Sequence, residues 1–153
     1  MRLELVNDWM TRDLITITPE TTLADADALM VEKMIRRLPV VDNGRLVGIV
    51  TYGDVRNARP SSVNRLNIWE LSYLIPHITI REMMTRDPIT VWPETTIGEA
   101  AQLMLKNMIG CLPVLDKQGQ LVGIITESDI FRMVARDWKF LQEQAGEPYA
   151  HYG

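Results

Sequence analysis

The chain has 153 residues, of which 46% are hydrophobic and 24% charged, as is ordinary for a soluble globular domain. This composition excludes a disordered or fibrous protein, and the length is enough to bury a core without disulfides or a structural metal. The 16 Lys and Arg residues against 20 Asp and Glu residues give a net charge of −4, which disfavours nucleic acid as a partner because phosphate binding usually needs a strongly basic face.

The sequence also lacks the features of a secreted, membrane or metal-binding protein. Residues 1–8 carry acids where a signal peptide needs an apolar run, and no stretch approaches the roughly 18 apolar residues of a membrane span. The single cysteine, Cys111, excludes an intrachain disulfide and has no zinc ligand set or nearby histidine with it. We therefore expect a cytoplasmic location, no membrane, no metal site and a buried structural thiol at Cys111.

An internal repeat dominates the chain. Four motifs, Met-Thr-Arg-Asp, Pro-Glu-Thr-Thr, Leu-Pro-Val and Leu-Val-Gly-Ile, start at Met10, Pro19, Leu38 and Leu46 and again at Met84, Pro93, Leu112 and Leu121. More than half of the positions between Met10 and Ala58 are identical in the second copy, which carries a one-residue insertion. Such duplication predicts two copies of one structural unit.

Each copy opens with a short β-branched run, 15–17 or 89–91, which predicts a brief extended segment. A helix should follow, because Thr22 with Asp25, and Thr96 with Glu99, have the spacing of a capping box. The apolar faces of these helices fall at helical spacing and are expected to lie in the core. They comprise Leu23, Ala26, Met30 and Met34 in the first copy and Ile97, Ala101, Met104 and Met108 in the second.

Two apolar runs, 38–41 and 46–51, come next, and Asn43-Gly44 between them supplies the positive φ angles of a tight hairpin. A second helix should start after Thr51 in one copy and after Thr126 in the other, so each copy reads as strand, helix, strand, strand, helix. We predict an α/β (α+β) fold whose two copies pack together. Its parts are a first repeat at 1–62, a connector at 63–82 with a helix from Asn67 to Pro76, a second repeat at 83–144, and a tail at 145–153.

The order of these motifs resembles the cystathionine β-synthase (CBS) domain family, and two copies in tandem resemble a Bateman module. The similarity covers roughly Trp9 to Met133. The resemblance implies two βαββα repeats related by a pseudo-two-fold axis, with two clefts between them that often bind adenosine nucleotides or related adenosyl compounds. It implies a non-catalytic module that requires no cofactor. The implied ligands are AMP, ADP or ATP, with S-adenosylmethionine and NAD as further candidates.

The resemblance also implies the site residues, because each cleft of the family combines both copies. One cleft would use Thr126 and Asp129 with Thr11, Ile15, Ile35 and Arg36, and the other Thr51 and Asp54 with Thr85, Ile89, Ile109 and Gly110. The Thr and Asp of each Thr-x-x-Asp would hold the ribose, and this chemistry is sound because a carboxylate can accept hydrogen bonds from two adjacent hydroxyls.

The two predicted clefts differ in charge. The residue just before Leu-Pro would lie near the phosphates of the cleft that contains the Asp of its own copy. Arg37 therefore favours phosphate recognition in the Asp54 cleft, whereas Cys111 takes that place in the Asp129 cleft. Arg56 and Arg132 are further phosphate candidates of lower weight.

Simpler interpretations stay open. Thr-x-x-Asp also fits a capping box, which alone explains both residues, and capping and ribose binding can coexist. Arg36 and Arg37 could instead form a solvated helix end. For the whole chain, the leading prediction is a ligand sensor that acts in trans on an effector protein or through its own oligomeric state, such as a homodimer. The alternative is a structural dimerisation scaffold with empty clefts, while a hydrolase would need an acid, base and nucleophile set that we cannot assemble from this sequence.

Overall fold

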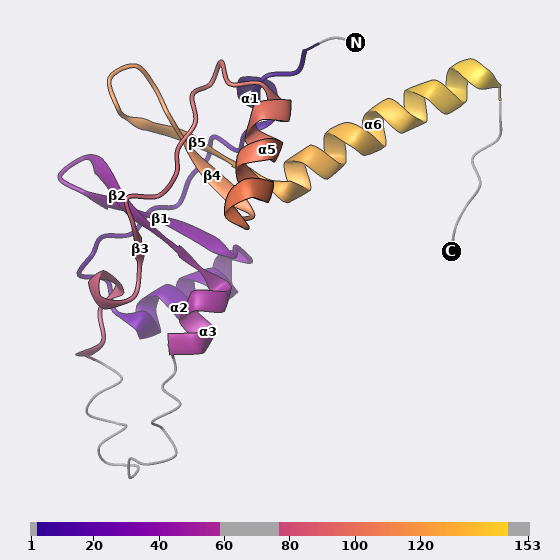
Figure 1. Cartoon of the computed structure of the whole chain (residues 1–153). Helices are drawn as coiled ribbons and strands as arrows, with labels where there is room; N and C mark the ends of the chain where they lie inside the picture. The colour runs from indigo at the N-terminus through magenta and orange to yellow at the C-terminus, as the bar shows by residue number, and fades with distance from the viewer. Residues whose placement is uncertain (1–2, 59–76, 147–153) are drawn as a thin grey trace. The chain divides into compact units, whose positions relative to one another are not determined.

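The computed structural model describes residues 3–58 and 77–146 (Figure 1). The predicted connector helix at 67–76 and the end of the predicted tail lie outside these ranges. The chain is a mixed α+β protein that divides into two compact units. Unit 1 comprises Met1–Arg12, Thr90–Lys117 and Val122–Gly153, and unit 2 comprises Asp13–Ile89 and Gln118–Leu121.

Unit 2 is built mainly from the first copy of the repeat. Its elements are α2 (Leu23–Lys33), β1 (Arg37–Asp42), β2 (Arg45–Thr51) and α3 (Tyr52–Ala58). Strands β1 and β2 form an antiparallel hairpin whose turn holds Asn43 and Gly44 at φ angles of 50° and 78°, as the Asn-Gly pair predicts. Helices α2 and α3 contact each other beside this hairpin (Figure 1). The predicted extended segment makes a single parallel bridge, from Ile17 to Val40.

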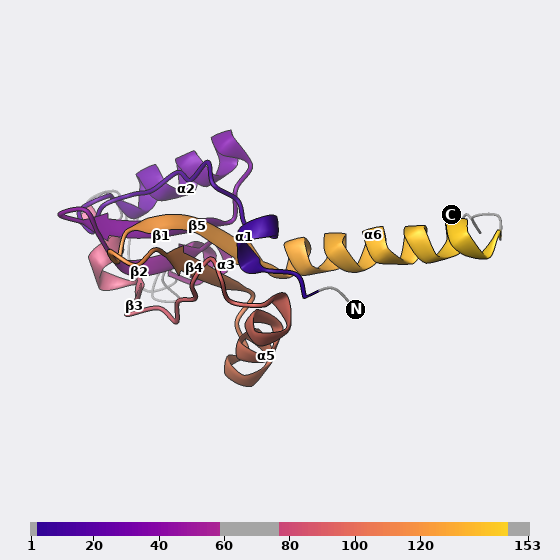
Figure 2. The same ribbon diagram turned by 90° about the horizontal axis from the view of Figure 1, so that it is seen from above.

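Unit 1 repeats this plan with α5 (Ile97–Asn107), β4 (Cys111–Leu115), β5 (Leu121–Thr126) and α6 (Glu127–Ala145). A parallel bridge joins Val91 to Val114, and the Cys111 thiol is buried as predicted. The short helix α1 (Val6–Trp9) packs against α6. The C-terminal half of α6 extends beyond the other elements of unit 1 (Figure 2).

The segment at the start of each copy packs in the unit that is built mainly from the other copy. In unit 2, η3 (Ile80–Glu82) is followed by β3 (Thr85–Arg86), and Thr85 pairs with Ile49 of β2. In unit 1, Thr11 pairs in the same way with Ile124 of β5. In each unit, a segment of one copy therefore pairs with a strand of the other copy, as β3 in unit 2 and as an isolated bridge in unit 1. The repeat pattern did not predict this exchange.

Glycines of the two Leu-Val-Gly-Ile motifs make room for the exchanged segments. A Cβ atom on Gly48 would lie 2.7 Å from Sδ of Met84 and 2.9 Å from the carbonyl oxygen of Thr85. A Cβ atom on Gly123 would lie 2.6 Å from Sδ of Met10. The repeated Met-Thr pair therefore packs directly against the glycine backbone, where a side chain would clash with it.

The helix starts agree with the predicted caps, but the helix ends differ from the predicted core. The backbone N–H of Asp25 donates to Thr22 Oγ1 at 3.1 Å, and Thr96 forms a complete capping box with its acidic partner. Met34 and Met108 are 90% and 92% exposed, so the prediction that they lie in the core is wrong. Each ends its helix in the left-handed conformation at φ 54°, which turns its side chain off the buried face.

Candidate functional site

In unit 2 the predicted ribose-binding pair, Thr51 and Asp54, lies where β2 passes into α3. The backbone N–H of Thr51 donates to Asp54 Oδ2 at 2.9 Å, and the backbone N–H of Asp54 donates to Thr51 Oγ1 at 3.1 Å. The capping interpretation is therefore confirmed at this helix start. Only Oδ2 is used, and no other described residue bonds to the second oxygen, Oδ1. One oxygen of this half-buried carboxylate therefore has no hydrogen-bond partner among the described residues.

Three arginines and one tyrosine lie in the segments that meet at this helix start. Arg37, the predicted phosphate group, pairs with Thr51 across the β1–β2 hairpin. The backbone N–H of Tyr52 donates to the carbonyl oxygen of Arg36 at 2.7 Å. The guanidinium of Arg56 lies 5.8 Å from the centre of the Tyr52 ring, a cation–π contact. Local structure thus places the backbone of Arg36 and Arg37 at the Thr51 end of the hairpin and the guanidinium of Arg56 beside Tyr52.

In unit 1 the equivalent pair, Thr126 and Asp129, lies where β5 passes into α6. Asp129 is the buried charged residue of this junction, at 4% exposure. Its Oδ2 accepts from the backbone N–H of Thr126 at 2.9 Å and from the Thr126 hydroxyl at 3.2 Å. Its Oδ1 accepts from the guanidinium of Arg132 at 2.7 Å. Both oxygens of Asp129 are therefore engaged within unit 1, which the sequence analysis did not predict.

The remaining predicted site residues divide between the two units. Thr85 and Ile89 lie in unit 2 with Asp54, and Thr11 lies in unit 1 with Asp129. The other predicted partners of Asp129 are Ile15, Ile35 and Arg36, which lie in unit 2, and those of Asp54 are Ile109 and Gly110, which lie in unit 1. Their approach to the two carboxylates stays a prediction.

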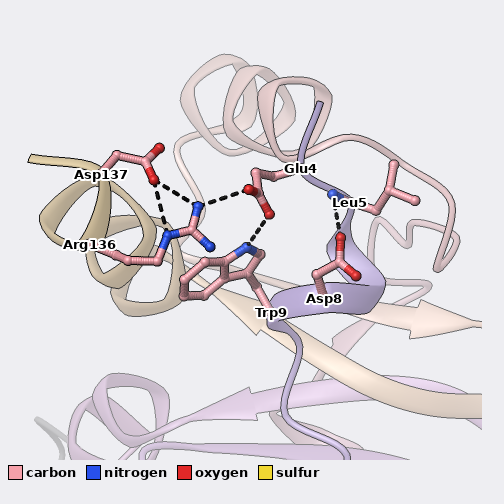
Figure 3. Close-up of polar contacts among 6 residues, drawn as sticks. All are labelled: Glu4, Leu5, Asp8, Trp9, Arg136 and Asp137. Carbon is pink, nitrogen blue, oxygen red and sulfur yellow. Dashed lines mark hydrogen bonds and ion pairs between the residues drawn. The ribbon is translucent and has the colours of Figure 1, made fainter. Parts of the chain in front are cut away.

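A polar cluster fixes the N-terminal segment of unit 1 to α6 (Figure 3). Arg136 donates to Glu4 Oε1 at 2.8 Å and to Asp137 Oδ1 at 2.7 Å, and its guanidinium lies 4.8 Å from the centre of the Trp9 ring. The indole N–H of Trp9 donates to Glu4 Oε2 at 3.0 Å. Bonding to Glu4 and Asp137 raises the pKa of the Arg136 guanidinium. This cluster positions the segment that carries Thr11.

An open apolar groove of about 440 Å³ lies between α5 and the start of α6. Exposed side chains on its rim include Leu105, Met108 and Phe131, with exposures of 80%, 92% and 66%. Asp129 does not line this groove. In unit 2, Val31 and Met34 are likewise exposed, at 64% and 90%. Apolar surface of this kind is typical of a protein contact.

The model of the CBS domain matches this chain twice, at residues 6–61 and 80–136. The chain belongs to the CBS domain family. The two matches agree with the repeat found in the sequence, and the CBS-pair structures described below share the mixed α+β fold. No helix within the described ranges is both long and apolar enough to cross a membrane.

Solved CBS-domain structures resemble the chain closely. Protein MJ1225 of Methanocaldococcus jannaschii is 37% identical, with a TM-score of 0.73 over 86% of this chain, which spans 48% of that protein. CBSX2, a CBS-pair protein of Arabidopsis thaliana, was solved in complex with AMP; it is 31% identical, with a TM-score of 0.72 over 87% of this chain and 97% of its own. The CBS domain pair of protein MJ0100 was solved with 5′-methylthioadenosine and S-adenosyl-L-methionine; it is 31% identical, with a TM-score of 0.74 over 89% and 99% of the two chains.

Proposed function

We propose that this chain is a non-catalytic regulatory module that binds adenosine nucleotides or related adenosyl compounds at its two Thr-x-x-Asp sites. The main support for this proposal is the geometry of Asp54, whose Oδ2 caps α3 while Oδ1 bonds to no other described residue. A ribose offers adjacent hydroxyl donors, and a partly desolvated carboxylate oxygen is a strong acceptor for them. Two similar CBS-pair proteins were solved with AMP or with adenosyl sulfur compounds, which supports this ligand class.

Each proposed site combines groups from both copies. Thr51, Asp54 and Thr85 would serve one ligand with Ile89, Ile109 and Gly110. Arg37 would bind its phosphates, because a guanidinium forms bidentate bonds to them. Thr126, Asp129 and Thr11 would serve the other ligand with Ile15, Ile35 and Arg36. We expect the stronger phosphate recognition at Asp54, since Cys111 replaces the arginine in the second copy.

Signalling is proposed to act through assembly or in trans on an effector protein. The apolar groove between α5 and α6, with Met108 on its rim, is the surface that we propose receives a second copy. Ligand binding can change such assembly only if the ligand binds the two arrangements with different affinity. The same groove supports the competing function, a dimerisation scaffold that binds no ligand.

Thermal melts separate these two functions. AMP, ADP, ATP, S-adenosylmethionine and NAD are each added to the purified chain. A ligand at one hundred times its dissociation constant stabilises the fold by about 2.7 kcal/mol, which corresponds to roughly 5–10 °C in Tm for a chain of this size. A shift with an adenosyl compound is the expected result. No shift with any of the five would contradict ligand binding and favour the scaffold.

Isothermal calorimetry then tests whether the two aspartates bind the ligand. We expect Asp54→Ala and Asp129→Ala each to weaken one of two binding events by about tenfold, because each removes a charge-assisted acceptor. Glu99→Ala is the matched control: Glu99 caps α5 in the same way but has no proposed ligand contact. It should lower Tm and leave binding unchanged. Unchanged binding in both aspartate variants would refute the ribose role.

A further inference from the structure

The two copies differ in what their aspartates contact inside the protein. Residue 57 in the first copy and residue 132 in the second stand at equivalent positions, three residues after the aspartate, and they are Asn57 and Arg132. Arg132 bonds to Oδ1 of Asp129 at 2.7 Å, whereas no described residue occupies Oδ1 of Asp54. Asp129 has an exposed side-chain fraction of 6% and Arg132 one of 68%. A buried acceptor is thus held by a cation that itself reaches solvent.

We propose that Arg132 is an internal competitor for the ligand, so that the Asp129 site fills only after this guanidinium leaves Oδ1. The inference rests on the proposed adenosyl binding and adds an order of filling to it: the Asp54 site fills first. A ribose hydroxyl approaching Asp129 must compete with the guanidinium of Arg132 for Oδ1, since Oδ2 already accepts two hydrogen bonds from Thr126. At Asp54 the hydroxyl meets an oxygen with no such bond among the described residues.

The size of this effect follows from the exposure of Arg132. Ion pairs with one partner in solvent are screened and are worth far less than buried pairs. We therefore expect the competition to weaken binding at Asp129 by about fivefold, the factor that corresponds to roughly 1 kcal/mol. Arg132 is therefore a specificity-determining residue, because it lowers the affinity of the Asp129 carboxylate for a ribose relative to that of Asp54.

Adenosine is the probe, because it carries the ribose and no phosphate that Arg132 could bind. In an Asp54→Ala background, in which the first site is weakened about tenfold, Arg132→Asn installs the residue of the first copy and should tighten adenosine binding at the Asp129 site about fivefold. The matched variant, Asn57→Arg in an Asp129→Ala background, should weaken binding at Asp54. Arg132→Gln serves as a second variant, and melts without ligand establish that each protein is folded.

Salt provides a readout that a purely structural role would not move. Since adenosine is neutral, added salt acts mainly on the Arg132–Asp129 pair and should tighten adenosine binding at that site but not at Asp54. If Arg132→Asn and Arg132→Gln leave adenosine affinity unchanged or weaken it, while the Asp54→Ala protein still binds, the competition is refuted and the proposed function survives. If neither the wild type nor the Arg132 variants bind any adenosyl ligand, the proposed function fails and this inference with it.

Discussion

Alanine at Gly48 or Gly123 should destabilise the protein, because these glycines seat the exchanged segments. A Cβ atom on Gly48 would approach the backbone oxygen of Thr85 to 2.9 Å, and one on Gly123 would approach that of Thr11 to 3.1 Å. The adjacent methionine sulfurs can move aside, but a backbone oxygen held in a strand pairing moves only with its strand. Overpacking of this kind typically costs about 1–3 kcal/mol. We expect about 2 kcal/mol for each variant and the larger loss for Gly48→Ala, with a fall in Tm of roughly 4–8 °C.

Urea and thermal unfolding measure this loss, and other glycines of the chain provide the control. A Cβ atom on Gly53, in α3, would approach Thr51 Oγ1 only to 3.7 Å, and one on Gly98, in α5, would approach Thr96 Oγ1 only to 4.0 Å. Alanine at either control should be neutral or slightly stabilising, because alanine favours helix. If Gly48→Ala and Gly123→Ala unfold like these controls, the exchanged segments do not seat on the sheets as described.

Three further predictions concern charge and assembly. Hydrogen bonds from the backbone N–H and the hydroxyl of Thr96 lower the pKa of the Glu99 carboxyl below its ordinary value, so the ionised carboxylate stabilises the fold fully above pH 4.5 and loses this effect as pH falls through the lower pKa of the folded state. Urea unfolding should therefore show a stability difference between wild type and Glu99→Gln that disappears in acid. A difference that persists in acid would contradict the role of the Glu99 charge. Arg136→Ala should lower Tm by up to a few degrees, and by less in high salt, because it removes the ion pair with Glu4. Lys139→Ala on the same helix should leave Tm unchanged. Equal effects of the two substitutions would refute the stabilising role of the cluster around Glu4. If the groove between α5 and α6 receives a second copy, light scattering should show Met108→Glu to be monomeric while Gln102→Glu keeps the wild-type mass, and equal masses would exclude this groove.

Much of the fold was predictable from local sequence rules. The Asn43-Gly44 hairpin and the caps at Thr22 and Thr96 follow from short-range geometry, because the residues that decide each feature lie within four positions of one another. The exposure of Met34 was not predictable from helical spacing, since spacing does not show that the last residue turns left-handed. Periodicity therefore identifies a buried face but not where that face ends.

The exchange of segments is a long-range feature and left a weaker signal. The repeated Met-Thr pair had no local role in its own copy, and a glycine between apolar β-branched neighbours indicates close backbone approach. Together these two facts could have indicated the pairing of Thr85 with the Gly48 strand. The contact between Arg132 and Asp129 left no comparable signal, because an arginine three residues after an acid on a helix is common on solvated faces.

The candidate site was predictable in part. The resemblance named the Thr-x-x-Asp pairs, and the structure places both at a strand-to-helix junction with the predicted capping bonds. The resemblance did not show that Asp54 has a carboxylate oxygen without a protein hydrogen bond among the described residues, whereas Asp129 does not. That difference depends on Arg132, which the sequence analysis treated only as a further phosphate candidate.

A crystal structure of the chain grown with AMP would show whether Asp54 binds the ribose. We expect the ribose hydroxyls of AMP within hydrogen-bond distance of Asp54 Oδ1, with Oδ2 still bonded to the backbone N–H of Thr51. Any AMP at the second site should have displaced Arg132 from Asp129. If AMP is bound elsewhere, while Asp54 bonds only to its helix cap and Asp129 only to its cap and to Arg132, the proposed sites are wrong.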